Sequence, residues 1–137
     1  MLLLVLAGGC SSLRSSIHKE DVLRSSIDAF HLALTNQETV DASRFLSSGG
    51  EDRAEELLGC FQRRVRVIDY EFHEIRRTGD PKRAVVHVRV ASHARDDLTV
   101  QDAVWEEHWY EENQSWHVRL DFEPFATLAA DCLRERR

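Results

Sequence analysis

The hydrophobic period of this chain changes between Arg64 and Arg66, from the 3.6-residue repeat of helices to the two-residue repeat of strands. Before the change, apolar residues recur at intervals of four, three and four residues, at Leu23, Ile27, Phe30 and Leu34. After it, apolar and polar residues alternate, most regularly from Ala84 to Val90. A run of helices followed by a run of strands is typical of an α+β fold.

The pattern predicts a single domain, because 137 residues suffice for one hydrophobic core. Helices are expected over 17–36, 40–46 and 51–63, and strands over 66–77, 82–93, 99–111 and 115–122. A short helix is expected after Pro124, which suits a first helical turn. The predicted architecture is therefore a set of N-terminal helices packed on a curved four-stranded antiparallel sheet, closed by a short C-terminal helix.

The two-residue period also assigns the faces of the strands. The apolar sets are expected to face the helices: Ile68, Tyr70, Phe72; Val86, Val88, Val90; and Trp116, Val118, Leu120. The opposite face then carries His87, Arg89, His93, His117, Arg119 and Asp121. Such a face is either a solvated surface with cross-strand ion pairs or a surface that binds a partner.

The strand over 99–111 has apolar residues on both faces. Ala103, Trp105 and Trp109 share one face, and Val100, Val104 and Tyr110 share the other. One explanation is a bend or bulge that switches the faces midway. The other is that Trp105 and Trp109 meet a second subunit, since aromatic residues are enriched in interface cores.

Several stretches resemble the nuclear-transport-factor-two-like family, also called SnoaL-like or cystatin-like. They are the amphipathic helix 22–34, the strands 84–91 and 103–110, and the final strand 114–120, in which Trp116 follows a polar turn. The resemblance covers 17–122, and the helix after Pro124 departs from it. It implies a cone-shaped domain with room for a pocket between sheet and helices, and we assign that domain to 17–137.

Some members of that family are lyases, isomerases or hydrolases with a His/Asp or Tyr/Asp pair inside the cone, and many others bind or assemble without catalysis. A general acid or base needs burial beside a charge partner to tune its pKa. The face assignment directs the histidines of the strands away from the cone, which favours a domain that binds a protein partner or small ligand without catalysis. The alternatives are a lyase or isomerase that uses a histidine or Tyr70 with an acidic residue, and a structural subunit of an envelope complex.

The N-terminus carries a short apolar run that ends in Ala7-Gly8-Gly9-Cys10. A hydrophobic run before small residues is the layout of a signal peptide and its cleavage site. The tetrapeptide resembles the lipobox of bacterial lipoproteins, which implies a signal peptide over 1–9, a lipid on Cys10, and a tether over 10–16. Ser11 resembles the signal for outer-membrane sorting, so the expected location is the cell envelope, facing the periplasm. The alternative is a buried N-terminal strand with a core cysteine.

Cys60 and Cys132 remain once Cys10 is assigned to the lipid. They form either a disulfide, as an oxidising envelope permits, or two buried thiols that act as small hydrophobic groups. Neither has a second cysteine or histidine at ligand spacing, so no metal site is expected. No phosphate-binding loop or nucleophile motif is present either, and we expect no cofactor.

The formal net charge of −6 argues against nucleic-acid binding, which needs a basic surface. The expected partners are a membrane, through the lipid, and a protein or a second copy of the chain, through the sheet face. The residues predicted for that surface are His87, Arg89, His93, Trp105, Trp109, His117 and Arg119.

Overall fold

The computed structural model of the protein describes residues 10–46 and 51–134, so the predicted signal peptide over 1–9 lies outside the described residues. The elements follow one another as α1 (Cys10–Thr35), α2 (Thr39–Ser43), α3 (Glu51–Arg64), β1 (Val65–Arg77), β2 (Arg83–Ala94), β3 (Asp97–Glu112), β4 (Ser115–Val118) and α4 (Phe125–Arg134). The predicted α+β fold, with its final short helix, is confirmed.

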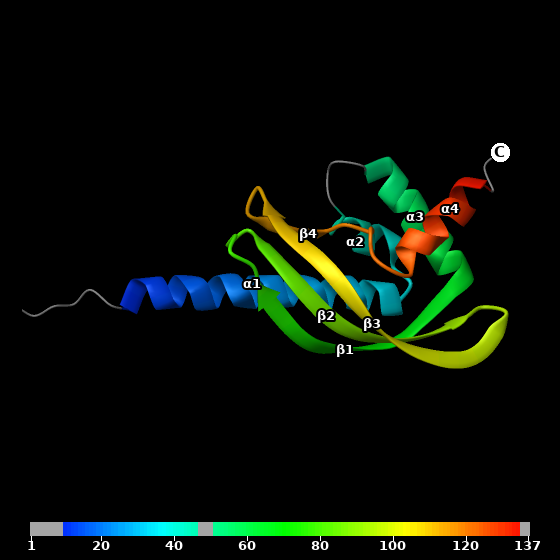
Figure 1. The fold of residues 1–137 in the computed structure, drawn as a ribbon, viewed down its shortest axis with the longest axis horizontal. Coiled ribbons are helices and arrows are strands. Elements are labelled where there is room, and N and C mark those ends of the chain that lie inside the picture. The colour runs from blue at the N-terminus through cyan, green and yellow to red at the C-terminus, as the bar shows by residue number, and fades with distance from the viewer. Residues whose placement is uncertain (1–9, 47–50, 135–137) are drawn as a thin grey trace, which may run out of the picture.

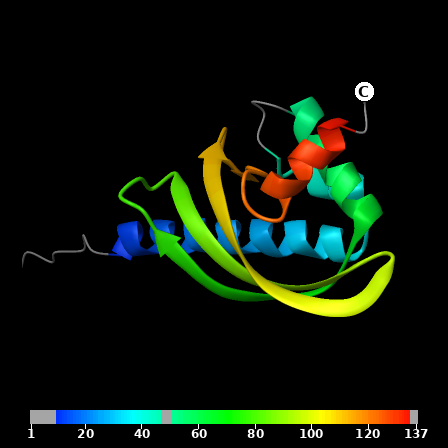
Figure 2. The ribbon, with the colours of Figure 1, turned by 45° about the vertical axis from the view of Figure 1, so that its right-hand side comes forward.

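The strands form one antiparallel sheet in the order β1-β2-β3-β4. The sheet is strongly curved and the helices gather on its concave side (Figures 1 and 2). Val86, Val88 and Val90 of β2 face those helices and are completely buried, as their alternation predicts. The opposite face of the sheet is covered by no element of the described chain (Figure 2).

Helix α1 contributes a row of buried apolar side chains to the core. Its predicted stripe of Leu23, Ile27, Phe30 and Leu34 is buried, with no member more than 1% exposed. The helix begins at Cys10, so residues 10–16 are helical where the sequence predicted a flexible tether. Serine tolerates a helix because its hydroxyl can bond a carbonyl one turn earlier, as Ser26 does to Val22 at 2.9 Å. The first turns of α1 project beyond the sheet (Figure 1).

The face assignment of β1 is wrong at one residue. The register between β1 and β2 shifts between Val67 and Asp69 and again between Phe72 and Glu74. Each shift is a β-bulge, which inserts an unpaired residue and reverses the alternation. Val67 therefore faces the core and is 2% exposed, whereas Ile68 is 43% exposed.

Strand β3 has no bulge in the region that the sequence left ambiguous. Its pairing with β2 is continuous from Tyr110 to Gln101. Trp105 and Trp109 both face the helices and are 3% and 0% exposed, while Val100 and Val104 on the other face are more than half exposed. Neither a switch of faces nor a partner subunit is needed to bury the tryptophans, so their assignment to a partner surface is wrong.

Candidate functional site

An ionisable pair lies inside the cone. His31 of α1 and Glu107 of β3 are both fully buried, and the His31 Nε2 atom lies 2.5 Å from the Glu107 Oε1 atom. The second carboxylate oxygen of Glu107 accepts a 2.7 Å hydrogen bond from the indole Nε1 of Trp109. Both oxygens of the buried carboxylate are thus satisfied, as a buried charge requires.

Local geometry explains how each member reaches the interior. His31 follows Ile27 by four residues and precedes Leu34 by three, so it lies on the apolar stripe of α1. Glu107 lies between Trp105 and Trp109 in a two-residue period, and it pairs with the buried Val86 of β2. The pair was missed from the sequence, although both positions carry these signals of burial.

Aromatic rings enclose the pair. Tyr70 stacks on the His31 ring with centroids 5.3 Å apart, and Trp105 lies 5.7 Å from the same ring. Phe30 packs edge-on against both His31 and Trp109. The His31 Nδ1 atom has no hydrogen-bond partner among the described residues.

Tyr70 is half-buried, and its hydroxyl donates a 3.3 Å hydrogen bond to the Asp28 carbonyl. Burial, followed by the nearby carboxylates of Asp28 and Asp69, raises the pKa of the Tyr70 phenol. Tyr70 is therefore a neutral donor at physiological pH. The structure brings together the three groups of the enzymatic alternative: a histidine, Tyr70 and an acidic residue.

A substrate could reach these groups only through a hollow in the surface that they line. Three surface hollows among the described residues have volumes of about 720, 130 and 580 Å³. Tyr70 lines the hollow of 130 Å³, but neither His31 nor Glu107 lines any of the three. A general acid or base must lie within hydrogen-bond reach of its substrate. In the described conformation the pair joins α1 to the sheet and presents no exposed atom to a substrate.

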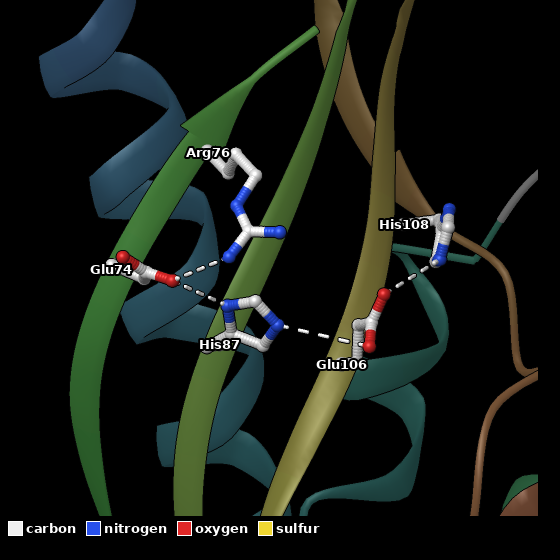
Figure 3. A network of polar contacts seen from close by, with 5 residues as sticks. All are labelled: Glu74, Arg76, His87, Glu106 and His108. Carbon is white, nitrogen blue, oxygen red and sulfur yellow. Dashed lines mark hydrogen bonds and ion pairs between the residues drawn. The ribbon is translucent and has the colours of Figure 1, made fainter.

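The side of the sheet away from the helices carries a second polar cluster, here called the outer sheet face. Its residues are Glu71, Glu74, Arg76, His87, Arg89, Asp102, Val104, Glu106 and His108. Figure 3 shows His87 of β2 between Glu74 of β1 and Glu106 of β3. The His87 Nδ1 atom lies 3.0 Å from Glu74 Oε1, and its Nε2 atom lies 3.8 Å from Glu106 Oε2.

Arg89 forms a second cross-strand link on this face. Its guanidinium lies 3.0 Å from Asp102 on one neighbouring strand and 3.4 Å from Glu71 on the other. The hydrogen bond to Asp102 and the charge of Asp102 raise the pKa of Arg89. His87 and Arg89 are thus each held between two acidic side chains, so the outer sheet face presents basic and acidic groups in fixed positions.

The other predicted surface residues occupy varied positions. His87, Arg89 and His93 point away from the helices, as the alternation predicts, and His93 contacts the Ala94 carbonyl through Nδ1 at 2.7 Å. His117 of β4 is half-buried, and Arg119 is exposed over the ring of Tyr110 at 5.1 Å. These two lie near the β3–β4 turn and do not join the His87 and Arg89 contacts.

Cys60 of α3 and Cys132 of α4 are joined in a disulfide with Cα atoms 6.3 Å apart. This separation is within the range that a bridge requires. Within residues 10–46 and 51–134, no three metal-ligating side chains converge to hold an ion. In the same part of the chain, none of the helices combines the length and hydrophobicity needed to cross a bilayer.

Comparison with known proteins gives structural neighbours alone. No protein-family model matches the chain, and no curated protein matches it. A protein of unknown function from Mycobacterium tuberculosis has a TM-score of 0.57 at 9% identity, covering 96% of this chain and 94% of its own. A protein of unknown function with a cystatin-like fold from Nostoc punctiforme has a TM-score of 0.53 at 11% identity, covering 77% and 91%.

An LEH-like epoxide hydrolase from Mycobacterium tuberculosis has a TM-score of 0.52 at 16% identity, covering 82% of this chain and 95% of its own. Similarity at these identities shows the fold. The chain has the cystatin-like, nuclear-transport-factor-two-like architecture, as its resemblance predicted. That architecture occurs with and without catalysis, so function has to be argued from the residues of this chain.

Proposed function

We propose that the protein is a lipid-anchored envelope protein whose domain binds a protein partner through the outer sheet face, without catalysis. One contrast carries this proposal. On the concave side of the sheet the ionisable pair is buried, with His31 and Glu107 both 0% exposed. The outer sheet face is uncovered and carries charged and apolar groups side by side.

The composition of the outer sheet face supports protein binding. Val104 is 55% exposed and lies directly opposite Arg89 in the β2–β3 register. Val100 and Leu98 continue the same row of β3 and are 54% and 78% exposed. Apolar groups beside preorganised charges favour recognition, because side chains already held by ion pairs lose less entropy on binding. The partner should therefore present both signs of charge and apolar groups, a requirement that a second copy of the chain also meets.

The anchor is supported by the position of Cys10 at the start of α1. Leu23, the first buried member of the stripe, lies thirteen positions after Cys10 along the helix. At 1.5 Å per residue this is a spacer of about 20 Å between a lipid and the domain. The disulfide between Cys60 and Cys132 agrees with an oxidising compartment such as the envelope.

Metabolic labelling with a fatty acid tests the anchor. The wild-type protein should carry the label and sediment with membranes, and Cys10→Ser should remove the label and release the protein. The matched control is the double variant Cys60→Ser/Cys132→Ser, which should stay labelled. A wild-type protein that remains soluble and retains Met1 is incompatible with the anchor.

Site-specific photo-crosslinking in intact cells tests the binding surface. A photoreactive residue at Val104 should give a discrete adduct, whose mass distinguishes a second copy from another protein. Val40 of α2 is the matched control, because it is apolar, 72% exposed and on the helical side. Equal adduct yields from the two positions, or no adduct at Val104, would refute the assigned surface.

A second candidate function is small-molecule lyase or isomerase chemistry, and the convergence of His31, Glu107 and Tyr70 inside the cone favours it. It requires the cone to open, so that His31 becomes accessible. Modification by diethyl pyrocarbonate separates the two functions, with the exposed His108 as internal reference. An enzyme predicts that His31 reacts at a rate comparable to His108 and is protected by substrate-like compounds. The binding function predicts that His31 reacts only when the protein unfolds.

A further inference from the structure

A hollow of about 580 Å³ lies apart from the outer sheet face and from the His31–Glu107 pair. Its walls come from the α1–α2 turn, α2, α3 and the β2–β3 turn. The lining residues are Gln37, Thr39, Gly59, Gln62, Arg63 and Arg95. The volume is that of a site for a small organic molecule.

The charge of this hollow differs from that of the protein as a whole. Arg63 and Arg95 are its only charged lining residues, and neither forms an ion pair with a carboxylate of the described residues. Other arginines of the chain, such as Arg64 and Arg89, contact acidic side chains. Two arginines without an acidic partner among the described residues thus line one hollow, although the formal net charge of the chain is −6.

Arg95 is oriented by two hydrogen bonds. Its Nε donates to the Gln62 carbonyl at 2.7 Å, and its Nη2 donates to Gln37 Oε1 at 2.6 Å. Both bonds lie on one edge of the guanidinium plane, so the donors of Nη1 remain for a ligand. A fixed guanidinium loses less entropy when it binds an anion.

Gln62 supplies a further donor that the protein itself does not use. The residue is 8% exposed, and its Oε1 accepts a hydrogen bond from the Thr39 hydroxyl. This contact fixes the amide, whose Nε2 is buried without a hydrogen-bond partner among the described residues. An unsatisfied buried donor is unfavourable, and a hydrogen bond to an anion would relieve it.

Gly59 of α3 lies beside the second guanidinium. It lies one helical turn before Arg63, and a Cβ atom built on it would lie 3.5 Å from Arg63 Nη1. The Arg63 side chain therefore folds back along α3 at the wall of the hollow. The neighbouring Cys60 ties this turn of α3 to α4 through the disulfide.

We propose that this hollow binds the phosphate group of a small phosphate ester or of a lipid headgroup. The guanidinium groups of Arg63 and Arg95 and the amide of Gln62 donate to its oxygens. Guanidinium groups match the geometry of phosphate oxygens and bind them by charge-assisted hydrogen bonds. Donors from three residues suit a tetrahedral anion better than a planar carboxylate, which has two oxygens.

The test is a titration of the full-length ¹⁵N-labelled chain with inorganic phosphate at constant ionic strength, followed by NMR. The side-chain amide of Gln62 and the Nε–H of Arg95 should shift saturably. Arg63→Gln should weaken the binding by about tenfold or more, the effect of removing one charged hydrogen bond. Arg77→Gln is the matched control, because it removes the same charge from the exposed end of β1. It should change the affinity less than twofold.

Sedimentation with phosphatidylglycerol vesicles then separates the two sources of phosphate. Binding to vesicles that Arg63→Gln abolishes and Arg77→Gln retains identifies a headgroup, and saturable binding of phosphate without vesicle binding identifies a free ester. The proposal is overturned if phosphate leaves Gln62 and Arg95 unshifted. It is also overturned if the two arginine variants lose affinity equally, since the effect would then be one of net charge.

Discussion

The imidazole Nε2 of His31 and the carboxylate Oε1 of Glu107 lie 2.5 Å apart, although the two residues are 76 positions apart in sequence, and neither side chain has exposed surface. The contact joins α1 to the central part of the sheet. A buried pair of this kind is costly to break, because removal of one partner leaves the other ionisable group without compensation.

Replacement of one partner should therefore destabilise the protein strongly. We expect Glu107→Leu or His31→Leu to lower the free energy of unfolding by about 3–5 kcal/mol. The double variant His31→Leu/Glu107→Leu should recover most of that loss, because well-packed apolar residues often substitute for a buried ion pair at little cost. Urea denaturation of the four proteins gives the coupling energy. Additive single effects would show that the two side chains are energetically independent.

The disulfide should contribute a comparable amount. Cys60 and Cys132 are 72 residues apart, and the loop entropy removed from the unfolded chain is worth roughly 4 kcal/mol in the chain-entropy model. Cys60→Ser/Cys132→Ser should lower the midpoint of denaturation by the corresponding amount, and reduction of the wild-type protein should reproduce the effect. A reduced protein with an unchanged midpoint would contradict the bridge.

Much of the fold can be predicted from the periodicity of apolar residues within single helices and strands. The stripe of α1 and the alternation of β2 are local properties, and the residues that they assign to the core are buried. The reversal at Ile68 was not predictable in this way, because a bulge depends on the register between two strands. The end of β4 at Val118, four residues before the predicted end at Phe122, likewise reflects the turn that leads into α4.

The site was harder to predict than the fold. Glu107 lies on the same face of its strand as Trp105 and Trp109, and His31 lies on the apolar stripe of α1. Each position therefore indicates from the sequence alone that a polar side chain is buried. Their pairing is a tertiary contact between distant segments, and no spacing in the sequence encodes it. His87 and Arg89 were assigned to the outer sheet face because alternation determines their side of β2. Glu74 and Arg76 reach the same face only because the register of β1 shifts after Phe72.

The outer sheet face should contribute little to stability. Arg89→Ala and Glu74→Ala replace exposed side chains of its ion pairs, and each should leave the midpoint of urea denaturation almost unchanged. Val88→Ala on the concave side of the same strand should cost roughly 1–3 kcal/mol, because its side chain is completely buried. Thermal and urea denaturation measure both. Equal losses at Arg89 and Val88 would mean that the face has a structural role.

Tyr70 should give a measurable dependence of stability on pH. Its raised pKa means that the unfolded chain loses the phenolic proton first as the pH rises through about 10, the ordinary value. The folded state then binds more protons than the unfolded state, so the free energy of unfolding falls as the pH increases through this range. Tyr70→Phe should remove this part of the decline. Parallel curves for the two proteins from pH 8 to 11 would contradict the assignment.

The size of the complex formed in detergent-solubilised envelopes tests the central claim most directly. Native electrophoresis would compare the wild-type protein with Val104→Glu on the outer sheet face and with His31→Leu/Glu107→Leu inside the cone. We predict that Val104→Glu migrates as the free chain, whereas the cone variant and the control Val40→Glu retain the complex. Loss of the complex in the cone variant, with Val104→Glu unaffected, would contradict the account.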